Sequence, residues 1–346
     1  MNTHALSAAA YEAALRRWDA VAKPLGALGR FEETLARIAA IQGTADIALT
    51  PRCALVFCAD HGVVAQGVSQ SGSEVTALVA QSIVRGASNI NLMAAAAQAD
   101  VFAVDMGMLS PVPGTLDRRQ GCGTADFSKG PAMSRAQAEN AVQAGVDLVG
   151  RMKDQGYRLV ATGEMGIGNT TAAAALACAL LNLSPAETAG RGAGLSDDGL
   201  RRKIRVIQRA LEMNRPDEND PMDILSRLGG FEIAGMAGAF LGGAVHGVPI
   251  VMDGLISSAA ALLAARICPE TRQFILPSHM SRSPGAKALM NALRLRPVID
   301  AGMALGEGTG AVMLFSLLDM AHRVYSGTHT FDSLGMDAYR PQEEKP

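Results

Sequence analysis

Five short runs of hydrophobic residues punctuate the chain, and each run ends in polar or acidic residues, in most cases beside a glycine. They read CALVFCADHG (53–62), ADVFAVDMGM (99–108), YRLVATGEMG (157–166), VPIVMDGLIS (248–257) and RQFILPSHMS (272–281). Their apolar residues are continuous rather than alternating, as in strands that are buried on both faces of a parallel sheet. The pattern therefore predicts five parallel strands.

Segments of helical length separate these runs. They cover residues 1–20, 30–42, 73–86, 134–155 and 255–267, and further apolar helices are expected at 172–181 and 311–321. Strands that alternate with helices form βαβ units, in which helices cover both faces of a parallel sheet. We therefore predict an α/β fold, a parallel sheet flanked by helices in a Rossmann-like, three-layer arrangement.

Composition narrows the class of protein. The chain has 346 residues, of which 49% are hydrophobic and 18% charged, and its net charge is −2. This is typical of a globular protein with a sizeable core and gives no indication of a nucleic-acid or membrane partner. Neither a signal peptide nor a membrane-spanning segment is expected. The five cysteines form no CxxC pair, which favours buried free thiols in a reducing cytoplasm.

The ends of the predicted strands carry the first candidate site residues. In open α/β sheets, ligands bind outside the carboxyl ends of the strands, so these ends are expected to line one crevice. The residues are Asp60, Asp105, Glu164, Asp253, Ser278 and His279. Contact with water would explain a polar residue at any single strand end, but its recurrence at all five favours a site.

The stretch GEMGIGNTT (163–171) has more glycines and polar residues than a plain strand-to-helix turn needs. Gly166 and Gly168 would let the backbone pass close to a ligand. Asn169 and the two threonines after it could cap the helix that follows. Free N–H groups at a helix start also favour an anion, and phosphate is the natural one.

A capped helix start without any ligand would ordinarily be at least as common as a phosphate site. The stretch is neither the dinucleotide fingerprint GxGxxG nor a P-loop. The presence of Glu164 argues against a capped helix start that binds no ligand. A carboxylate beside a phosphate cradle is useful only when the ligand also carries or develops positive charge.

Two further glycine-rich loops have the same character. In GRGAGLSDDGLRRK (190–203), Ser196 or Asp197 could cap a helix, and Lys203 stands near its second turn. An ordinary glycine loop with a solvated basic face explains this segment equally well. In LGEGTG (305–310), Glu307 lies between two glycines, where it is either a helix N-terminal charge or a general base held against a substrate.

With these motifs in hand, nearly the whole chain resembles the nicotinate-nucleotide–dimethylbenzimidazole phosphoribosyltransferase family. The matching segments are KPLGALGRFE, CADHGVVAQGVS, VDMGM, GTADFSKGPAM, GEMGIGNTTAAAA, GRGAGLSDDGLRRK, PIVMDGLISSAAAL, PSHMS and LGEGTGAVM. The combination of GEMGIGNTT and LGEGTGA, in that order, is highly specific.

The resemblance implies a reaction in which nicotinate mononucleotide gives its phosphoribosyl group to a benzimidazole nitrogen, with inversion at the anomeric carbon and release of nicotinate. It implies that Glu307 is the catalytic base and that Glu164 favours positive charge developing on the ribose. It assigns nucleotide and phosphate binding to Gly166, Gly168, Asn169, Thr170, Gly192, Gly194, Lys203, Asp253 and Ser281, and base binding to Ser69, Gln70, Ser71 and Leu305. It implies no metal and no cofactor.

The resemblance also implies a domain organisation and an oligomeric state. An α/β core is expected at 26–289, and a small helical domain is expected from both chain ends, 1–25 and 290–346. A cytoplasmic homodimer is expected.

Two positions depart from the family's pattern. Ser283 replaces a common Glu after the PSHMS segment, and Gly72 stands where a Pro is frequent. These departures leave the identity of the acceptor base undetermined. The alternatives are a related phosphoribosyltransferase that uses adenine or a phenol as acceptor, and a nucleotide-binding regulator without catalysis.

Overall fold

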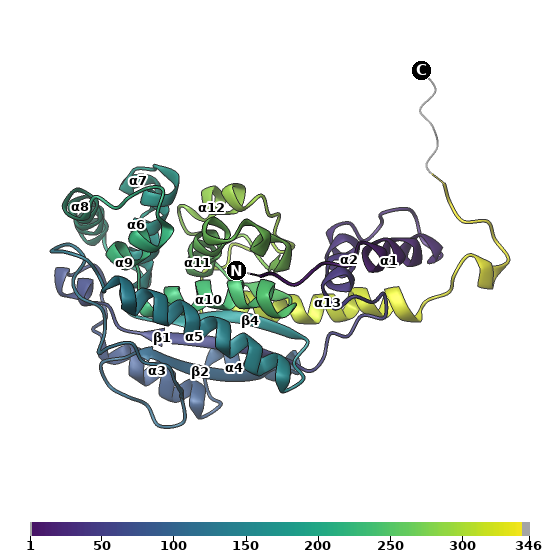
Figure 1. The fold of residues 1–346 in the computed structure, drawn as a ribbon, viewed down its shortest axis with the longest axis horizontal. Helices are drawn as coiled ribbons and strands as arrows, with labels where there is room; N and C mark the ends of the chain where they lie inside the picture. Colours follow the sequence, from purple (N-terminus) through teal and green to yellow (C-terminus); the bar gives the residue numbers. More distant parts are fainter. Residues whose placement is uncertain (1, 341–346) are drawn as a thin grey trace, which may run out of the picture.

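The structure, a computed structural model, describes residues 2–340, and in this part of the chain six parallel strands form one sheet (Figure 1). The strands, in the order in which they lie side by side, are β3 (Leu116–Asp117), β2 (Asp100–Gly107), β1 (Arg52–Ala59), β4 (Leu159–Met165), β5 (Ile250–Met252) and β6 (Ile275–Pro277). The five predicted strands are confirmed. The sequence pattern missed β3, because two residues are too few to form a hydrophobic run.

The helices form two layers around this sheet. Their bounds are α1 Ala8–Ala20, α2 Arg30–Gln42, α3 Glu74–Val84, α4 Asn89–Ala96, α5 Arg135–Asp154, α6 Asn169–Leu181, α7 Pro185–Thr188, α8 Asp197–Asn214, α9 Pro221–Leu228, α10 Phe231–His246, α11 Leu255–Ile267, α12 Ala286–Leu293 and α13 Thr309–Gly327. Short 3-10 helices lie at Gly62–Gln66, Pro269–Phe274 and Asp332–Leu334. The predicted α/β, three-layer arrangement is confirmed, although α1 begins at Ala8 rather than at the start of the chain.

Successive residues of the central strand face opposite layers. Leu55 and Phe57 of β1 pack into one hydrophobic cluster with residues of α5, α10 and α11. Ala54 and Val56 pack into a second cluster, with residues of α1, α2, α3, α4 and α13. A strand that is apolar on both faces therefore serves two cores, which explains its continuous hydrophobic run.

Glycine allows α5 and α10 to approach each other closely. A side-chain carbon at Gly238 would overlap the carbonyl oxygen of Val142, and one at Gly145 would overlap that of Gly235. A side-chain carbon at Gly235 would also lie 2.8 Å from the ring of Phe57 on β1. The glycines of these helices thus set the spacing between α5 and α10, and between α10 and the sheet.

The two ends of the described chain meet. The rings of Trp18 and Tyr325 lie 5.1 Å apart, and the N–H of Phe331 donates to the carbonyl of Ala20 over 3.0 Å. In Figure 1, purple α1 and α2 lie beside the yellow end of α13. These contacts support the proposed helical domain, whose boundaries near residues 25 and 290 stay a prediction. Residues 1 and 341–346 of that domain lie outside the described part.

Within residues 2–340, no helix combines the length and the apolar character that crossing a bilayer requires.

Candidate active site

A cavity of about 270 Å³ opens at the carboxyl ends of β4, β5 and β6. Of the predicted site residues, its lining includes Glu164, Gly166, Asn169, Thr170, Gly192, Asp253, Ser281, Leu305 and Glu307. A larger cavity of about 750 Å³ lies between α2 and the segment that follows α12, but it contains none of the predicted site residues. We therefore place the candidate active site in the smaller cavity.

The glycine loop that precedes α6 lies where the strand order reverses, between β1 and β4. A side-chain carbon at Gly166 would lie 2.5 Å from the carbonyl oxygen of Ala59, the last residue of β1. Gly168, with φ of 101°, is the N-cap of α6. Only glycine adopts the conformation of Gly168 readily, and only glycine fits the close contact at Gly166. The loop thus occupies the position at which doubly wound sheets bind nucleotides.

The expectation that Asn169 or the threonines after it cap α6 is wrong. The cap makes no side-chain hydrogen bond; Asn169 instead donates from Nδ2 to the Oε2 atom of Glu164. The N–H of Ile167 donates to the hydroxyl of Thr76, over 3.1 Å. The sequence pattern could not show these two hydrogen bonds, because Glu164 and Thr76 come within reach of the loop only when it folds back onto the sheet.

Lys203 does not line the cavity itself but lies directly behind Thr170, which does. Its side chain is fully buried, and Nζ donates to the Thr170 hydroxyl over 2.8 Å. A side-chain carbon at Gly192 would lie 3.9 Å from Nζ. Burial lowers the pKa of Lys203 to about 8, and among the described residues no carboxylate makes a salt bridge with it. A buried cation without a counter-ion is a natural anion site.

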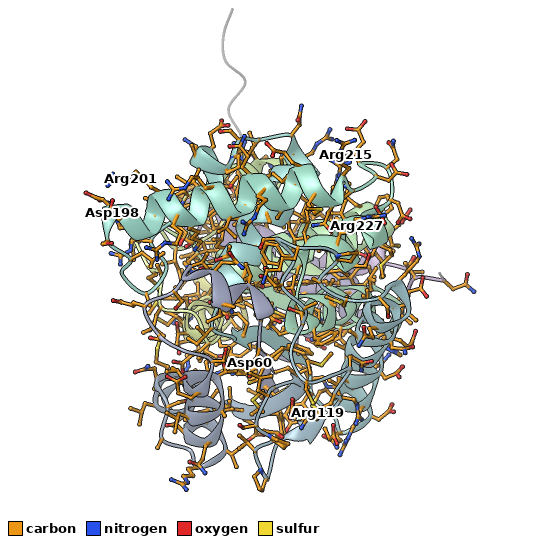
Figure 2. The ribbon with its side chains drawn as sticks, turned by 90° about the vertical axis from the view of Figure 1, so that its left-hand side faces the viewer. Asp60, Arg119, Asp198, Arg201, Arg215 and Arg227 are labelled. Carbon is orange, nitrogen blue, oxygen red and sulfur yellow. The ribbon has the colours of Figure 1, made fainter. Side chains whose placement is uncertain are left out.

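The basic residues of α8 therefore divide between two environments. Figure 2 looks at this end of the molecule and shows α8 running across it, with Asp198 and Arg201 at one end and Arg215 at the other. Asp198 and Arg201 form an exposed ion pair, whereas Lys203 faces inward. The explanation of Lys203 as part of a solvated face is wrong. Ser196 caps α8 by accepting from the N–H of Gly199 over 3.1 Å.

Glu164 is a buried carboxylate near the centre of the cavity lining. Burial is the main reason that its pKa lies well above the ordinary value, and the negative charges of Asp253 and Glu232 raise it further. The hydrogen bond from Asn169 acts in the opposite direction, because it stabilises the ionised form. The cavity therefore holds a carboxylate that a cationic ligand would help to ionise.

Replacing Asn169 by Ala is expected to move the acidic limb of the kcat profile to higher pH. The variant loses the hydrogen bond that favours ionised Glu164, so the pKa of this carboxyl rises and its charge is lost at a higher pH. A hydrogen bond to a charged group corresponds to a shift of roughly one to two pH units. The measurement is kcat against pH, with Asn291→Ala on the exposed face of α12 as control. An unchanged limb would contradict an ionised Glu164.

Glu307 is held by backbone on both sides. It adopts φ of 60° between Gly306 and Gly308, and a side-chain carbon at Gly163 of β4 would overlap its carbonyl oxygen. Its Oε1 accepts from Asn89 Nδ2 over 3.2 Å and its Oε2 from the N–H of Ile90 over 3.3 Å. The carboxylate thus faces the amino terminus of α4 rather than that of α13, the helix that follows it.

Asp253 occupies the amino terminus of α13 instead. Its Oδ1 accepts from the N–H groups of Gly310 and Ala311, over 2.9 and 3.1 Å, and lies 3.8 Å from Nδ1 of His279. Burial raises the pKa of Asp253, while His279 and the backbone N–H groups oppose that rise. One oxygen is therefore committed to the helix, although the side chain also lines the cavity.

The prediction that all the strand ends line one crevice is wrong for three residues. Asp60 accepts from the N–H of Leu109 over 2.8 Å, and Asp105 accepts from two N–H groups in the turn after β2. Ser278 donates to the carbonyl of Met252 over 2.6 Å. None of the three belongs to the cavity lining, because each hydrogen-bonds a backbone group at the end of its own or a neighbouring strand.

The residues predicted to bind the base fall into two groups. Leu305 lines the cavity and is 54% exposed. Ser69, Gln70 and Ser71 lie outside the lining, where Gln70 donates to the carbonyl of Ala193 and so joins the loop that contains Gly194. The contact of this segment with a base stays a prediction.

The two departures from the family's pattern lie in different places. Ser283 lines the cavity, and its N–H donates to the hydroxyl of Ser281 over 3.3 Å. Gly72 precedes α3, and a side-chain carbon there would overlap the carboxylate of Glu74.

Several contacts of the site were not predicted, although Gly163 and Gly306 stand within the motifs themselves. Gly163 and Gly306 allow β4 and the Glu307 turn to meet, and a side-chain carbon at Gly306 would lie 2.7 Å from Oε1 of Glu164. Asn89 follows the N-cap Ser88, and this local cap pattern could have located the helix start that faces Glu307.

Charge is unevenly distributed around the cavity. Lys203 donates to Thr170 of the lining, and the same lining contains the carboxylates of Glu164, Asp253 and Glu307. The arrangement suits a ligand with a phosphate at one end and a cationic centre or a proton donor at the other.

Comparison with known proteins agrees with this geometry. A family model described as "Phosphoribosyltransferase" matches residues 3–336. A nicotinate-nucleotide–dimethylbenzimidazole phosphoribosyltransferase from Roseiflexus sp. (strain RS-1) is 45% identical over 334 residues, which are 96% of this chain and 95% of that protein. The protein of the same name from Acetivibrio thermocellus is 41% identical over 329 residues, 94% of each chain.

A solved structure shows the same fold. The crystal structure of CobT from Thermus thermophilus has a TM-score of 0.90 and 41% identity, and the match covers 95% of this chain and 99% of that one. Fold, motifs and full-length similarity agree, and the chain belongs to the nicotinate-nucleotide–dimethylbenzimidazole phosphoribosyltransferase family.

Proposed function

We propose that this enzyme transfers the phosphoribosyl group of nicotinate mononucleotide to 5,6-dimethylbenzimidazole or a similar base. The products are α-ribazole 5′-phosphate and nicotinate, and the reaction belongs to the assembly of the lower ligand of cobalamin. The observation that carries the proposal is the pairing, around one cavity, of the buried cation Lys203 with the carboxylate Glu307.

The 5′-phosphate is bound at the start of α6. The N–H groups of Gly168 and Thr170 and the ammonium of Lys203 supply the donors and the positive charge. Gly192 lets the neighbouring loop approach Thr170, since a side-chain carbon there would lie 3.2 Å from its hydroxyl. The substrate is thereby held with its ribose over Glu164.

The bond between the anomeric carbon and the pyridinium nitrogen breaks, and its electron pair stays on the nicotinate. The leaving group therefore needs no proton, and positive charge develops on the ribose. Glu164, held by Asn169, stabilises this charge when ionised. The cationic pyridinium of the bound substrate favours that ionised form.

The new bond forms between the anomeric carbon and a ring nitrogen of the base. Glu307 takes the proton from the other ring nitrogen, which makes the base a stronger nucleophile. Both neighbours of this carboxylate, Asn89 and the N–H of Ile90, are uncharged donors at 3.2–3.3 Å. Neither contact comes from an ammonium or guanidinium group, so no cation competes with the incoming proton for the carboxylate of Glu307.

The proposal extends to assembly and location. A homodimer is supported by the exposed apolar side chains of Leu78, Leu92 and Met320, on α3, α4 and α13, which belong to one helical layer. A cytoplasmic location is supported by the five free cysteines, four of which are buried.

Product analysis with a panel of bases tests the function. With nicotinate mononucleotide and equimolar dimethylbenzimidazole, benzimidazole and adenine, we expect transfer to both benzimidazoles, with discrimination by rate. Met165, Ile167 and Leu305 give the cavity an apolar lining. Such a lining separates flat bases by only about 1–3 kcal/mol per methyl-sized difference.

Three results would contradict parts of this account. A single base used to the exclusion of the others by more than about 10,000-fold would mean that polar groups select the acceptor. Transfer to adenine or a phenol alone would favour the related phosphoribosyltransferase. Nucleotide binding without any transfer would favour the regulator.

A further inference from the structure

His61 and Glu232 form a buried pair that the transfer reaction does not use directly. His61 Nε2 lies 2.6 Å from Glu232 Oε1, and neither side chain is exposed to solvent. His61 follows β1, and Glu232 lies in the first turn of α10. Within residues 2–340, His61 Nδ1 and Glu232 Oε2 have no hydrogen-bond partner. Such a pair is poor at stabilising a fold, so its presence calls for another reason.

The imidazole of His61 lies directly behind the glycine loop. A side-chain carbon at Gly168 would be 3.0 Å from His61 Cβ, and one at Gly166 would be 3.5 Å from His61 Cδ2 and Nε2. On the α10 side, a side-chain carbon at Gly230 would overlap the ring. The backbone of the loop therefore packs against His61, together with the Val64 side chain and the carbonyl of Ala59.

The backbone beneath the pair is itself fixed. The N–H of Gly62 donates to the carbonyl of Thr124 over 3.0 Å, and the N–H of Thr124 donates to the carbonyl of Asp60 over 2.9 Å. Figure 2 shows Asp60 deep below α8. With the backbone fixed on this side, the hydrogen bond between His61 and Glu232 limits the one remaining freedom, which is the rotation of the ring.

We propose that His61 and Glu232 are a positioning pair, which sets the glycine loop so that its N–H groups meet the 5′-phosphate of the substrate. The proposal rests on the proposed function. Neither side chain belongs to the cavity lining, so both act through the loop. An apolar side chain of similar size at position 61 would fill the space. Without a hydrogen bond to Glu232, however, it would be free to rotate beneath the loop.

The test compares nicotinate mononucleotide with nicotinate riboside, which lacks the 5′-phosphate. In His61→Leu/Glu232→Leu, both polar side chains are removed together, so neither is left buried without its partner. We expect the Kd for the mononucleotide to rise about tenfold or more, the effect of one well-placed charge-assisted hydrogen bond. The Kd values for the riboside and for dimethylbenzimidazole should stay within about threefold of wild type, since neither is bound through a phosphate.

Two further variants sharpen the measurement. Glu232→Gln keeps a hydrogen bond to His61 and should retain the wild-type preference for the mononucleotide. Arg52→Met/Asp319→Leu is the matched control, because Arg52 Nη2 lies 2.6 Å from Asp319 and occupies the opposite end of the same strand. Its removal should lower the melting temperature without changing the ratio of the two Kd values.

The outcomes separate the two proposals. A wild-type ratio in the folded double variant would overturn the positioning role. If that variant does not fold, His61→Gln, which keeps a polar group beside Glu232 but lacks the ring, gives the same comparison. A wild-type enzyme that transfers no phosphoribosyl group to any base would overturn the proposed function instead.

Discussion

Replacing Glu307 by Gln is expected to lower kcat by about 100- to 10,000-fold, the usual contribution of a general base. Gln is almost isosteric with Glu, and its single carbonyl oxygen can keep one of the two hydrogen bonds that Asn89 and the N–H of Ile90 donate, so the turn between Gly306 and Gly308 should persist. What it cannot do is accept the proton of the acceptor base. The loss should therefore appear in kcat, while both substrates still bind.

The measurement is steady-state transfer at saturating concentrations of both substrates, with the melting temperature as a check on folding. Glu218→Gln, at an exposed position far from the cavity in sequence, is the control for removing one carboxylate. If Glu307→Gln keeps more than about a tenth of the wild-type kcat, Glu307 is not the base.

Replacing Lys203 by Met is expected to raise the Kd for nicotinate mononucleotide by roughly 10- to 100-fold, the range of a charge-assisted hydrogen bond to phosphate. Met fills a similar volume and needs no hydrogen bond, so the buried site is not left with an unpaired charge. Thr170, which accepts from Lys203, loses one hydrogen bond. Binding of the acceptor base should change little.

The same variant makes a pH prediction. In the free enzyme, burial lowers the pKa of Lys203 to about 8. Above that pH the side chain is mostly the neutral amine, which must take up a proton when the phosphate binds. The Kd of wild type should therefore rise by roughly tenfold per pH unit above pH 8, and Lys203→Met should lose this dependence. Calorimetry between pH 7 and about 9.5 measures both, with Arg201→Met on the exposed side of α8 as control. Equal losses for nucleotide and base would point to misfolding instead.

The sequence by itself determined much of this protein. Hydrophobic runs buried on both faces located five of the strands, since a strand between two helical layers has no polar face. The glycine motifs located the loop before α6 and the turn around Glu307, because left-handed backbone and close contacts leave a direct trace in residue type. Full-length motif similarity identified the family.

The contacts made by the polar side chains in these motifs were decided only by the tertiary structure. Asn169 has the chemistry of a helix cap, but folding places it against Glu164. Glu307 precedes α13, but its carboxylate lies at the start of α4, more than two hundred residues earlier. Lys203 sits among exposed basic residues in sequence, and only the packing of α8 buries it.

The physical reason is the range of the interactions. Backbone conformation and hydrophobic periodicity are set by neighbours in sequence, so a pattern predicts them. The partner of a buried polar group is whichever donor or acceptor the fold brings within about 3 Å, and that depends on how distant segments pack. His61 and Glu232 meet across 171 positions, and no local pattern announces the pair.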